Sequence, residues 1–133
     1  MKLTDLLANN RALTQWQRGL NQNSRTLFTG IQGTIKTLLM ATAFDNQPDK
    51  YVIITDNQYH ASELYSDLSE FVGEAKVFQY FSDDNIFAEY AIASKERLAY
   101  RLDALSFLQD KEADGFLIIP IFALRNFLPD PAV

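Results

Sequence analysis

The stretch YVIITDNQYHASELYSDLSEFVG, residues 51–73, determines the fold class of this 133-residue chain. Its first five residues are a continuous aromatic and β-branched run, which is typical of a strand covered on both faces. A helix is expected to follow, with Asp56 as its N-cap and Gly73 as its stop. The apolar residues on one face of that helix are Leu64, Leu68, Phe71 and Val72. A buried strand leading directly into an amphipathic helix predicts an α/β unit.

Helices and strands also alternate upstream of this unit. Residues 3–20 are expected to form one or two short amphipathic helices, with a break at Asn9-Asn10 and with Asn10 as the N-cap of the second. A short apolar strand is expected at residues 26–28. A helix is expected at residues 36–44, where the sequence KTLLMATAF contains no helix breaker.

Downstream, the pattern predicts a strand at residues 76–80, a helix capped by Ser94, a buried strand at residues 116–119 and a short helix at residues 121–127. The expected buried stripe of the long helix is Leu98, Leu102, Leu105 and Leu108. Strands that alternate with helices at this spacing form parallel sheets with helices on both faces. We therefore expect a P-loop-NTPase-like, three-layer α/β/α fold with a mostly parallel sheet.

The composition narrows the class of protein. The chain is 47% hydrophobic and carries a net charge of −5, with acidic residues spread along its length. This balance argues against strong nucleic-acid binding by the chain alone, because such affinity comes largely from basic residues on phosphates. The absence of cysteine excludes disulfides and cysteine-ligated zinc. No run approaches the roughly 20 apolar residues of a membrane span, and we expect a cytoplasmic protein without a membrane partner.

A phosphate-binding loop is the main candidate site. Residues 29–39 read TGIQGTIKTLL, and the pattern G-x-x-x-x-G-K-[ST] is met at its first glycine, its lysine and its hydroxyl residue, but Ile35 replaces the second glycine. The candidate residues are Gly30, Gly33, Thr34, Lys36 and Thr37. Glycine is needed where backbone approaches a ligand closely, and a β-branched residue is the least adaptable replacement.

We therefore expect a degenerate loop that binds no nucleotide, with no catalytic residue, metal or cofactor in this segment. A hydrolysing site also needs a carboxylate at the end of a neighbouring strand, and the last buried strand ends instead at Pro120. Two other interpretations stay open. The loop is a plain strand-to-helix turn with a solvated Lys36, or it is a working site.

The order of several motifs resembles one family. Asn57-Gln58 and the run LYSDL at residues 64–68 follow the loop, and IASKERLAYRLDALSFL at residues 92–108 and FLIIPIFALRNFLPDP at residues 116–131 come later. This arrangement resembles the excision-repair protein UvrB and, more closely, the UvrB-like amino-terminal region of Mfd, the bacterial transcription-repair coupling factor. Ile35 places the chain on the Mfd side, where the corresponding loop is degenerate.

The resemblance implies an organisation and a function. Residues 1–24 would be an N-terminal helical segment, and residues 25–131 a UvrB-like α/β subdomain of a larger protein. The full-length protein would be an ATP-dependent DNA translocase that displaces stalled RNA polymerase and recruits UvrA for nucleotide excision repair. Its ATP and magnesium would act at a distant motor, and UvrA would bind mainly through a following subdomain.

Two readings compete with this non-catalytic module. The first is an active UvrB-type P-loop ATPase or helicase fragment, and the second is an unrelated α/β domain with a coincidental loop.

Other chemistry-bearing residues have less specific patterns. His60, the only histidine, is expected to lie on the surface. An acidic connection with Asp83, Asp84 and Glu89 lacks the spacing of a calcium loop. A basic cluster of Lys95, Arg97 and Arg101 is expected to form a solvated face opposite the leucine stripe. The aromatic connection at residues 80–90 is expected either to plug the core or, as we favour, to dock a neighbouring domain.

Overall fold

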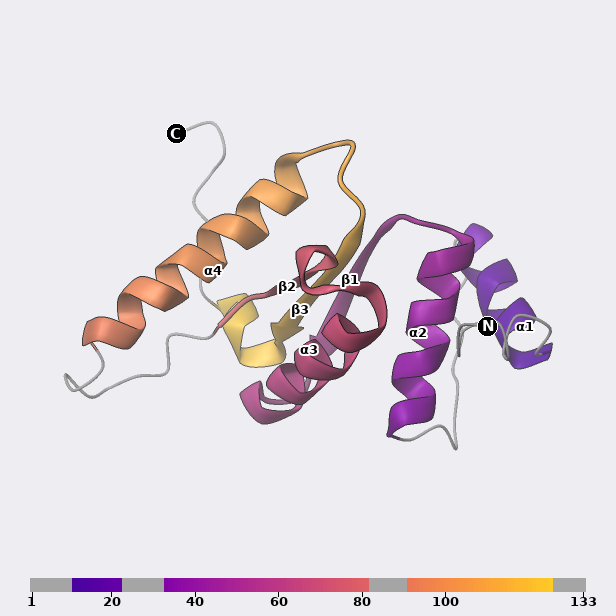
Figure 1. Cartoon of the computed structure of the whole chain (residues 1–133), viewed down its shortest axis with the longest axis horizontal. Coiled ribbons are helices and arrows are strands. Elements are labelled where there is room, and N and C mark those ends of the chain that lie inside the picture. Colours follow the sequence, from indigo (N-terminus) through magenta and orange to yellow (C-terminus); the bar gives the residue numbers. More distant parts are fainter. Residues whose placement is uncertain (1–10, 23–32, 82–90, 126–133) are drawn as a thin grey trace.

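The computed structural model describes residues 11–22, 33–81 and 91–125 of the chain. Its elements follow one another as shown in Figure 1. They are α1 (Arg11–Asn21), α2 (Thr34–Asn46), β1 (Lys50–Thr55), α3 (Gln58–Val72), the 3₁₀ turn η2 (Glu74–Lys76), β2 (Val77–Gln79), α4 (Ala91–Gln109), β3 (Gly115–Pro120) and the 3₁₀ turn η4 (Ile121–Arg125). Among these residues, no helix is both long enough and apolar enough to cross a membrane.

The three strands form one parallel sheet in the order β1-β3-β2. The last of these strands in the sequence, β3, is therefore the central one of the three. Tyr51 of β1 and Val77 of β2 both lie opposite Phe116 of β3. Each parallel connection contains a helix, as strand geometry requires. The predicted α/β class with a parallel sheet is confirmed.

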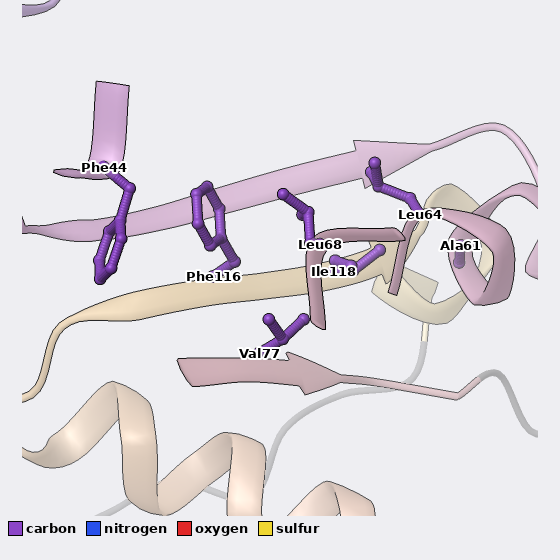
Figure 2. Packing of buried hydrophobic residues seen from close by; sticks show 7 residues of the cluster. All are labelled: Phe44, Ala61, Leu64, Leu68, Val77, Phe116 and Ile118. Atoms are coloured by element: carbon purple, nitrogen blue, oxygen red, sulfur yellow. The ribbon is translucent and has the colours of Figure 1, made fainter. Parts of the chain in front are cut away.

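A first hydrophobic core lies between the sheet and the helices α2 and α3. Its buried members are Phe44, Ala61, Leu64, Leu68, Val77, Phe116 and Ile118, and Figure 2 shows these seven side chains gathered over the sheet. The rings of Phe44 and Phe116 lie 5.2 Å apart between centroids. Full burial of a side chain of this size contributes about 1.5–3 kcal/mol, so this cluster fixes α3 against the sheet.

A second core lies on the opposite face, under α4. Leu117 of β3 joins Tyr80, Ala104, Phe107 and Ala123 there. Phe107 stacks on Phe78 with ring centroids 4.5 Å apart. Successive residues of a strand point to opposite faces, so Phe116 and Leu117 belong to different cores. Helices therefore cover both faces of the sheet, as the predicted three-layer α/β/α fold requires.

Close approach of two strands depends on Gly115, the first residue of β3. Its φ is 145°, and a Cβ there would lie 2.3 Å from the backbone oxygen of Lys76, just before β2. Its N–H donates a 3.0 Å hydrogen bond to the carbonyl of Asp49, just before β1. Because Gly115 has no side chain, β3 can begin between its two neighbours.

The prediction for the buried face of α4 was wrong. Leu98 and Leu102 are both 55% exposed and Leu108 is 37% exposed, whereas Ala104 and Phe107 are buried. The helix has apolar residues on more than one face. The face that packs against the sheet is the one with the small Ala104 and with Phe107, whose ring stacks on Phe78. Ser94 is not the N-cap either, because α4 begins at Ala91.

The other predicted elements agree with the structure where it describes them. α2 begins two residues before the predicted helix and ends two residues after it, and each of the three observed strands overlaps its predicted range. Gly73 follows α3 as its C-cap, with φ 92°. Asn10, the predicted strand at residues 26–28 and the predicted boundary between residues 24 and 25 lie outside the described residues.

Candidate functional site

A cavity of about 650 Å³ opens at the carboxyl end of β1, where α2 and α3 begin. Its lining comes from α2 and the residue before it, from the end of β1 and from the first half of α3. The residues are Gly33, Lys36, Thr37, Ile53, Ile54, Thr55, Asp56, His60, Glu63, Leu64 and Asp67. Ligands of open α/β sheets bind at this edge, beyond the carboxyl ends of the strands.

Three of the five predicted loop residues meet at this cavity, namely Gly33, Lys36 and Thr37. Thr34 is the first residue of α2 and is exposed, and it does not line the cavity. Gly30 lies outside the described residues. Ile35 is 60% exposed and also does not line the cavity. The structure therefore does not place the Ile35 side chain where a phosphate would be crowded.

Gly33 makes the turn into α2. Its φ of 64° and ψ of −140° belong to a region that glycine adopts and other residues avoid. Its carbonyl accepts a 3.1 Å hydrogen bond from the N–H of Lys36. No side chain caps the helix at this position. The glycine is thus explained by backbone conformation alone, whether or not a ligand binds.

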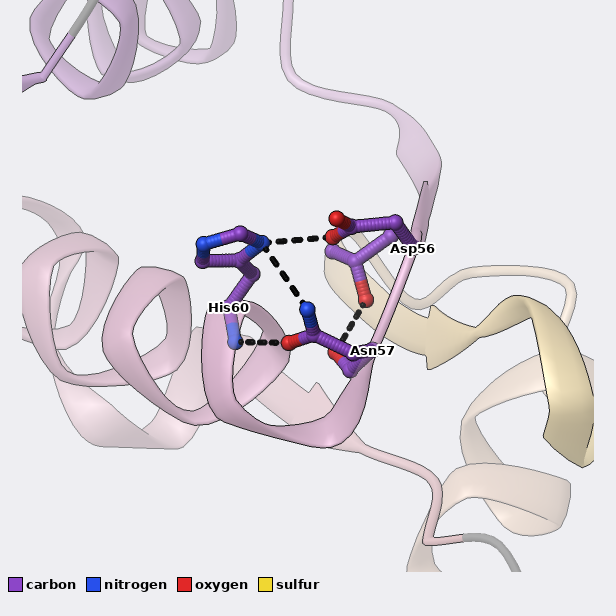
Figure 3. A network of polar contacts seen from close by, with 4 residues as sticks. Asp56, Asn57 and His60 are labelled. Carbon is purple, nitrogen blue, oxygen red and sulfur yellow. Dashed lines mark hydrogen bonds and ion pairs between the residues drawn. The ribbon is translucent and has the colours of Figure 1, made fainter.

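A polar network surrounds the start of α3 (Figure 3). The Asn57 side chain accepts a 2.8 Å hydrogen bond from the backbone N–H of His60, so Asn57 is the N-cap. The prediction of Asp56 as the cap was wrong by one residue. Asp56 instead contacts Nδ1 of His60 through its Oδ1 at 2.6 Å. Nδ1 also lies 3.3 Å from the amide nitrogen of Asn57, but the shorter contact favours a proton on Nδ1 shared with Asp56.

The contact with His60 affects the charge of Asp56. The hydrogen bond from His60 lowers the pKa of the Asp56 carboxyl below its ordinary value. Asp56 therefore stays anionic at neutral pH. His60 is on the surface as predicted, with 52% of its side chain exposed. Its pairing with Asp56 was missed, although the two residues lie only four positions apart at the expected start of the helix.

Among the described residues, the cavity lining is more anionic than cationic. Glu63 and Asp67 of α3 lie four residues apart on the face that also carries His60. Together with Asp56 they bring three carboxylates to the cavity, whereas Lys36 is the one lysine or arginine of the described lining. Sequence reasoning did not select Glu63 or Asp67. Their recurrence at helical spacing after Asp56 is the signal that could have found them.

β1 is followed directly by Asp56, but the neighbouring strand β3 ends without a carboxylate. Thr55 at the end of β1 lies opposite Pro120 at the end of β3. A P-loop ATPase uses a carboxylate from a neighbouring strand to hold magnesium. Within the part of the chain that the structure describes, no group of three or more histidine, cysteine or carboxylate side chains could hold a metal ion.

The other candidate residues lie away from this cavity. Arg101 lies over the ring of Tyr80, 5.3 Å from its centroid, so it faces the sheet side of α4 and the predicted solvated face was wrong for this residue. Tyr80 itself is buried in the second core, so the core-plug alternative holds there. The acidic connection and most of the aromatic one lie outside the described residues, as do the side chains of Lys95 and Arg97.

Two curated proteins are similar to this chain over most of its length. A transcription-repair-coupling factor from Staphylococcus aureus strain USA300 is 27% identical over 112 residues, which is 82% of this chain and 10% of that protein. Another from Bacillus subtilis strain 168 is 32% identical over 104 residues, which is 77% of this chain and 9% of that protein. This chain is similar to transcription-repair-coupling factors. The resemblance predicted from the sequence motifs is confirmed.

The similarity concerns a small part of each relative. The chain spans about a tenth of the length of these transcription-repair-coupling factors. No family profile matches the chain, and no solved structure matches it.

Proposed function

We propose that this chain is the non-catalytic amino-terminal module of a transcription-repair-coupling factor. The observation that carries the proposal is the similarity to such factors over 82% of the chain in one case and 77% in another. The full-length protein would be a cytoplasmic, ATP-dependent DNA translocase that displaces stalled RNA polymerase and recruits UvrA for excision repair. Its ATP and magnesium would act at a motor outside this chain.

In this proposal the module acts through protein contacts. Its immediate partners are other domains of the same polypeptide. UvrA binds mainly through a subdomain that follows this one, and RNA polymerase and DNA are engaged by the full-length protein. The net charge of −5 supports a role in protein contacts more than direct binding to DNA phosphates.

Two features of the cavity support the absence of catalysis. Asp56, Glu63 and Asp67 outnumber Lys36, and like charges oppose the entry of a triphosphate. β3, the central described strand, ends at Pro120 and offers no carboxylate there to hold a metal ion. Both features are independent of Ile35.

Calorimetric titration of the chain with Mg-ATP tests the proposal. We expect no binding in the micromolar range and no ATP hydrolysis. Ile35→Gly restores the glycine of the loop pattern, but it changes neither the cavity charge nor Pro120. We therefore expect this variant to remain without hydrolysis as well. Micromolar binding of Mg-ATP that is lost in Lys36→Ala would overturn the proposal.

The second candidate function is an active UvrB-type P-loop ATPase or helicase fragment. The convergence of Gly33, Lys36 and Thr37 on one cavity favours it, because these residues hold phosphates and magnesium in working loops. Asp56 also follows a strand and is not committed to capping the helix. The titration above separates the two candidates, since only this one requires nucleotide to bind.

A further inference from the structure

The strongest unexplained feature is the combination of charge and unused hydrogen-bonding groups at the cavity. Within the described part of the chain, neither Glu63 nor Asp67 takes part in an ion pair. Thr37 is only 2% exposed, yet it lines the cavity and its hydroxyl makes no hydrogen bond to another described residue. A hydroxyl that lines a cavity and has no partner among the described residues is available to a group that enters the cavity.

The chemistry of the lining defines that ligand. Two free carboxylates and a hydroxyl oxygen can all accept hydrogen bonds, which suits a donor with positive charge. Ile53 and Leu64 line the same cavity and supply apolar surface. A long side chain with an aliphatic stem and a cationic head matches both parts of this lining.

The geometry favours an organic cation over a metal ion. A cavity of about 650 Å³ is much larger than a metal ion requires, and the described residues do not include a metal-binding cluster. The planar guanidinium presents five donors and pairs readily with carboxylates. Asp56, already engaged by His60, leaves Glu63 and Asp67 as the available acceptors.

We propose that this cavity receives an arginine side chain from a partner protein segment. The guanidinium pairs with Glu63 and Asp67, the Thr37 hydroxyl accepts one further hydrogen bond, and the aliphatic stem lies against Ile53 and Leu64. This inference rests on the proposed function as a non-catalytic interaction module. In this proposal, the cavity lies where a phosphate-binding loop would hold an anion, but it binds a cationic side chain.

An NMR titration of the isotope-labelled 133-residue chain tests this proposal. The probe is a blocked Ala-Arg-Ala tripeptide, and the matched control carries citrulline, a neutral isostere, in place of arginine. We expect arginine-dependent shifts at Thr37, Glu63 and Asp67, with a dissociation constant on the order of millimolar because one side chain supplies the contacts. The citrulline peptide should leave these signals unchanged.

Variants identify the residues responsible. The double variant Glu63→Gln with Asp67→Asn should weaken the arginine peptide by about tenfold or more, because it removes two charged acceptors. Glu70→Gln changes an exposed carboxylate of the same helix outside this cavity and should bind as the wild type does.

The outcomes separate this inference from the proposed function. Equal shifts with arginine and citrulline, or none with either, would overturn the arginine site and leave the non-catalytic module standing. Binding of Mg-ATP at the same residues would overturn both. The comparison of the two peptides on the wild-type chain decides the matter even if the double variant does not fold.

Discussion

The side chain of Tyr51 in β1 packs against the first core and also makes a hydrogen bond. Its ring stacks on Phe116 with centroids 5.3 Å apart, and its hydroxyl donates a 2.8 Å hydrogen bond to the carbonyl of Gln47. Burial raises the pKa of the Tyr51 phenol above its ordinary value, and the nearby Asp49 carboxylate raises it further. The folded state therefore keeps the Tyr51 proton at pH values where the unfolded chain loses it.

This difference gives a pH-dependent stability. The contribution of the neutral Tyr51 phenol is fully present below about pH 10, the ordinary pKa of tyrosine, and is lost as the pH rises through the higher pKa of the folded state. Tyr51→Phe should lower the free energy of unfolding by about 1 kcal/mol at pH 8, because a part-buried hydrogen bond is removed. Above about pH 10 the difference in free energy of unfolding between the wild type and Tyr51→Phe should become smaller.

Urea unfolding of wild type and Tyr51→Phe between about pH 8 and 11 checks this expectation. The wild-type free energy should fall more steeply with pH than that of the variant. A gap that stays constant over the whole range would show that the Tyr51 phenol is not perturbed by its surroundings.

Single residues of the candidate site could be predicted where a sequence motif selects them. They could not be predicted where two adjacent residues are equally suited to the same role. Gly33, Lys36 and Thr37 were selected by the loop pattern, and they do line one cavity. The helix cap was misplaced because both Asp56 and Asn57 are good N-caps, and only the backbone path decides between them.

At the scale of elements, α4 shows how the sheet selects one face of a helix. The helix carries a leucine series and, on another face, Ala104 and Phe107. Ala104 allows close approach, and Phe107 stacks on Phe78. Periodicity alone cannot rank two apolar faces, because the decision depends on which partners the sheet presents.

Truncation of both faces of α4 measures which one stabilises the fold. Phe107→Ala should reduce the free energy of unfolding by about 3–5 kcal/mol, the usual cost of an emptied aromatic site. Leu102→Ala, at a position 55% exposed, should change it by about 0.5 kcal/mol or less. Chemical denaturation of the two variants gives both values. A larger loss for Leu102→Ala than for Phe107→Ala would reverse the assignment of the buried face.

At the scale of the whole molecule, the described helices cover one face of the sheet only in part. α4 packs over β2 and β3, whereas Val52 and Ile54 of β1 are 52% and 56% exposed. Ile53 points to the other face and packs against the first core. Neighbouring apolar side chains on an exposed edge strand favour association between molecules.

Replacing this exposed pair should reduce self-association without unfolding the chain. We expect Val52→Thr with Ile54→Lys to sediment as a monomer at concentrations where the wild type associates, with stability changed by about 0.5–1 kcal/mol at most. Ile53→Lys is the matched control on the opposite face and should destabilise the fold strongly. Sedimentation velocity over a concentration series measures the effect. A double variant that unfolds as readily as Ile53→Lys would mean that Val52 and Ile54 belong to the core.

The sequence predicted the fold class but not the order of the strands in the sheet. Alternating buried strands and helices predict a parallel sheet with helices on both faces, and this is what forms. The order β1-β3-β2 was not predictable, because strand sequences do not record which neighbour each strand will pair with. Likewise, the acidic lining of the cavity became apparent only when α3 was placed beside the end of β1.

The central position of β3 has a consequence for the synthesis of the chain. Within the described ranges, β1 and β2 do not pair with each other, and each forms its ladder with β3. While a ribosome is still translating the segment before residue 115, neither earlier strand therefore has a partner among the described strands. The ladders of the described strands can form only after Gly115–Pro120 has emerged, so β3 joins two parts of the nascent chain that were made before it.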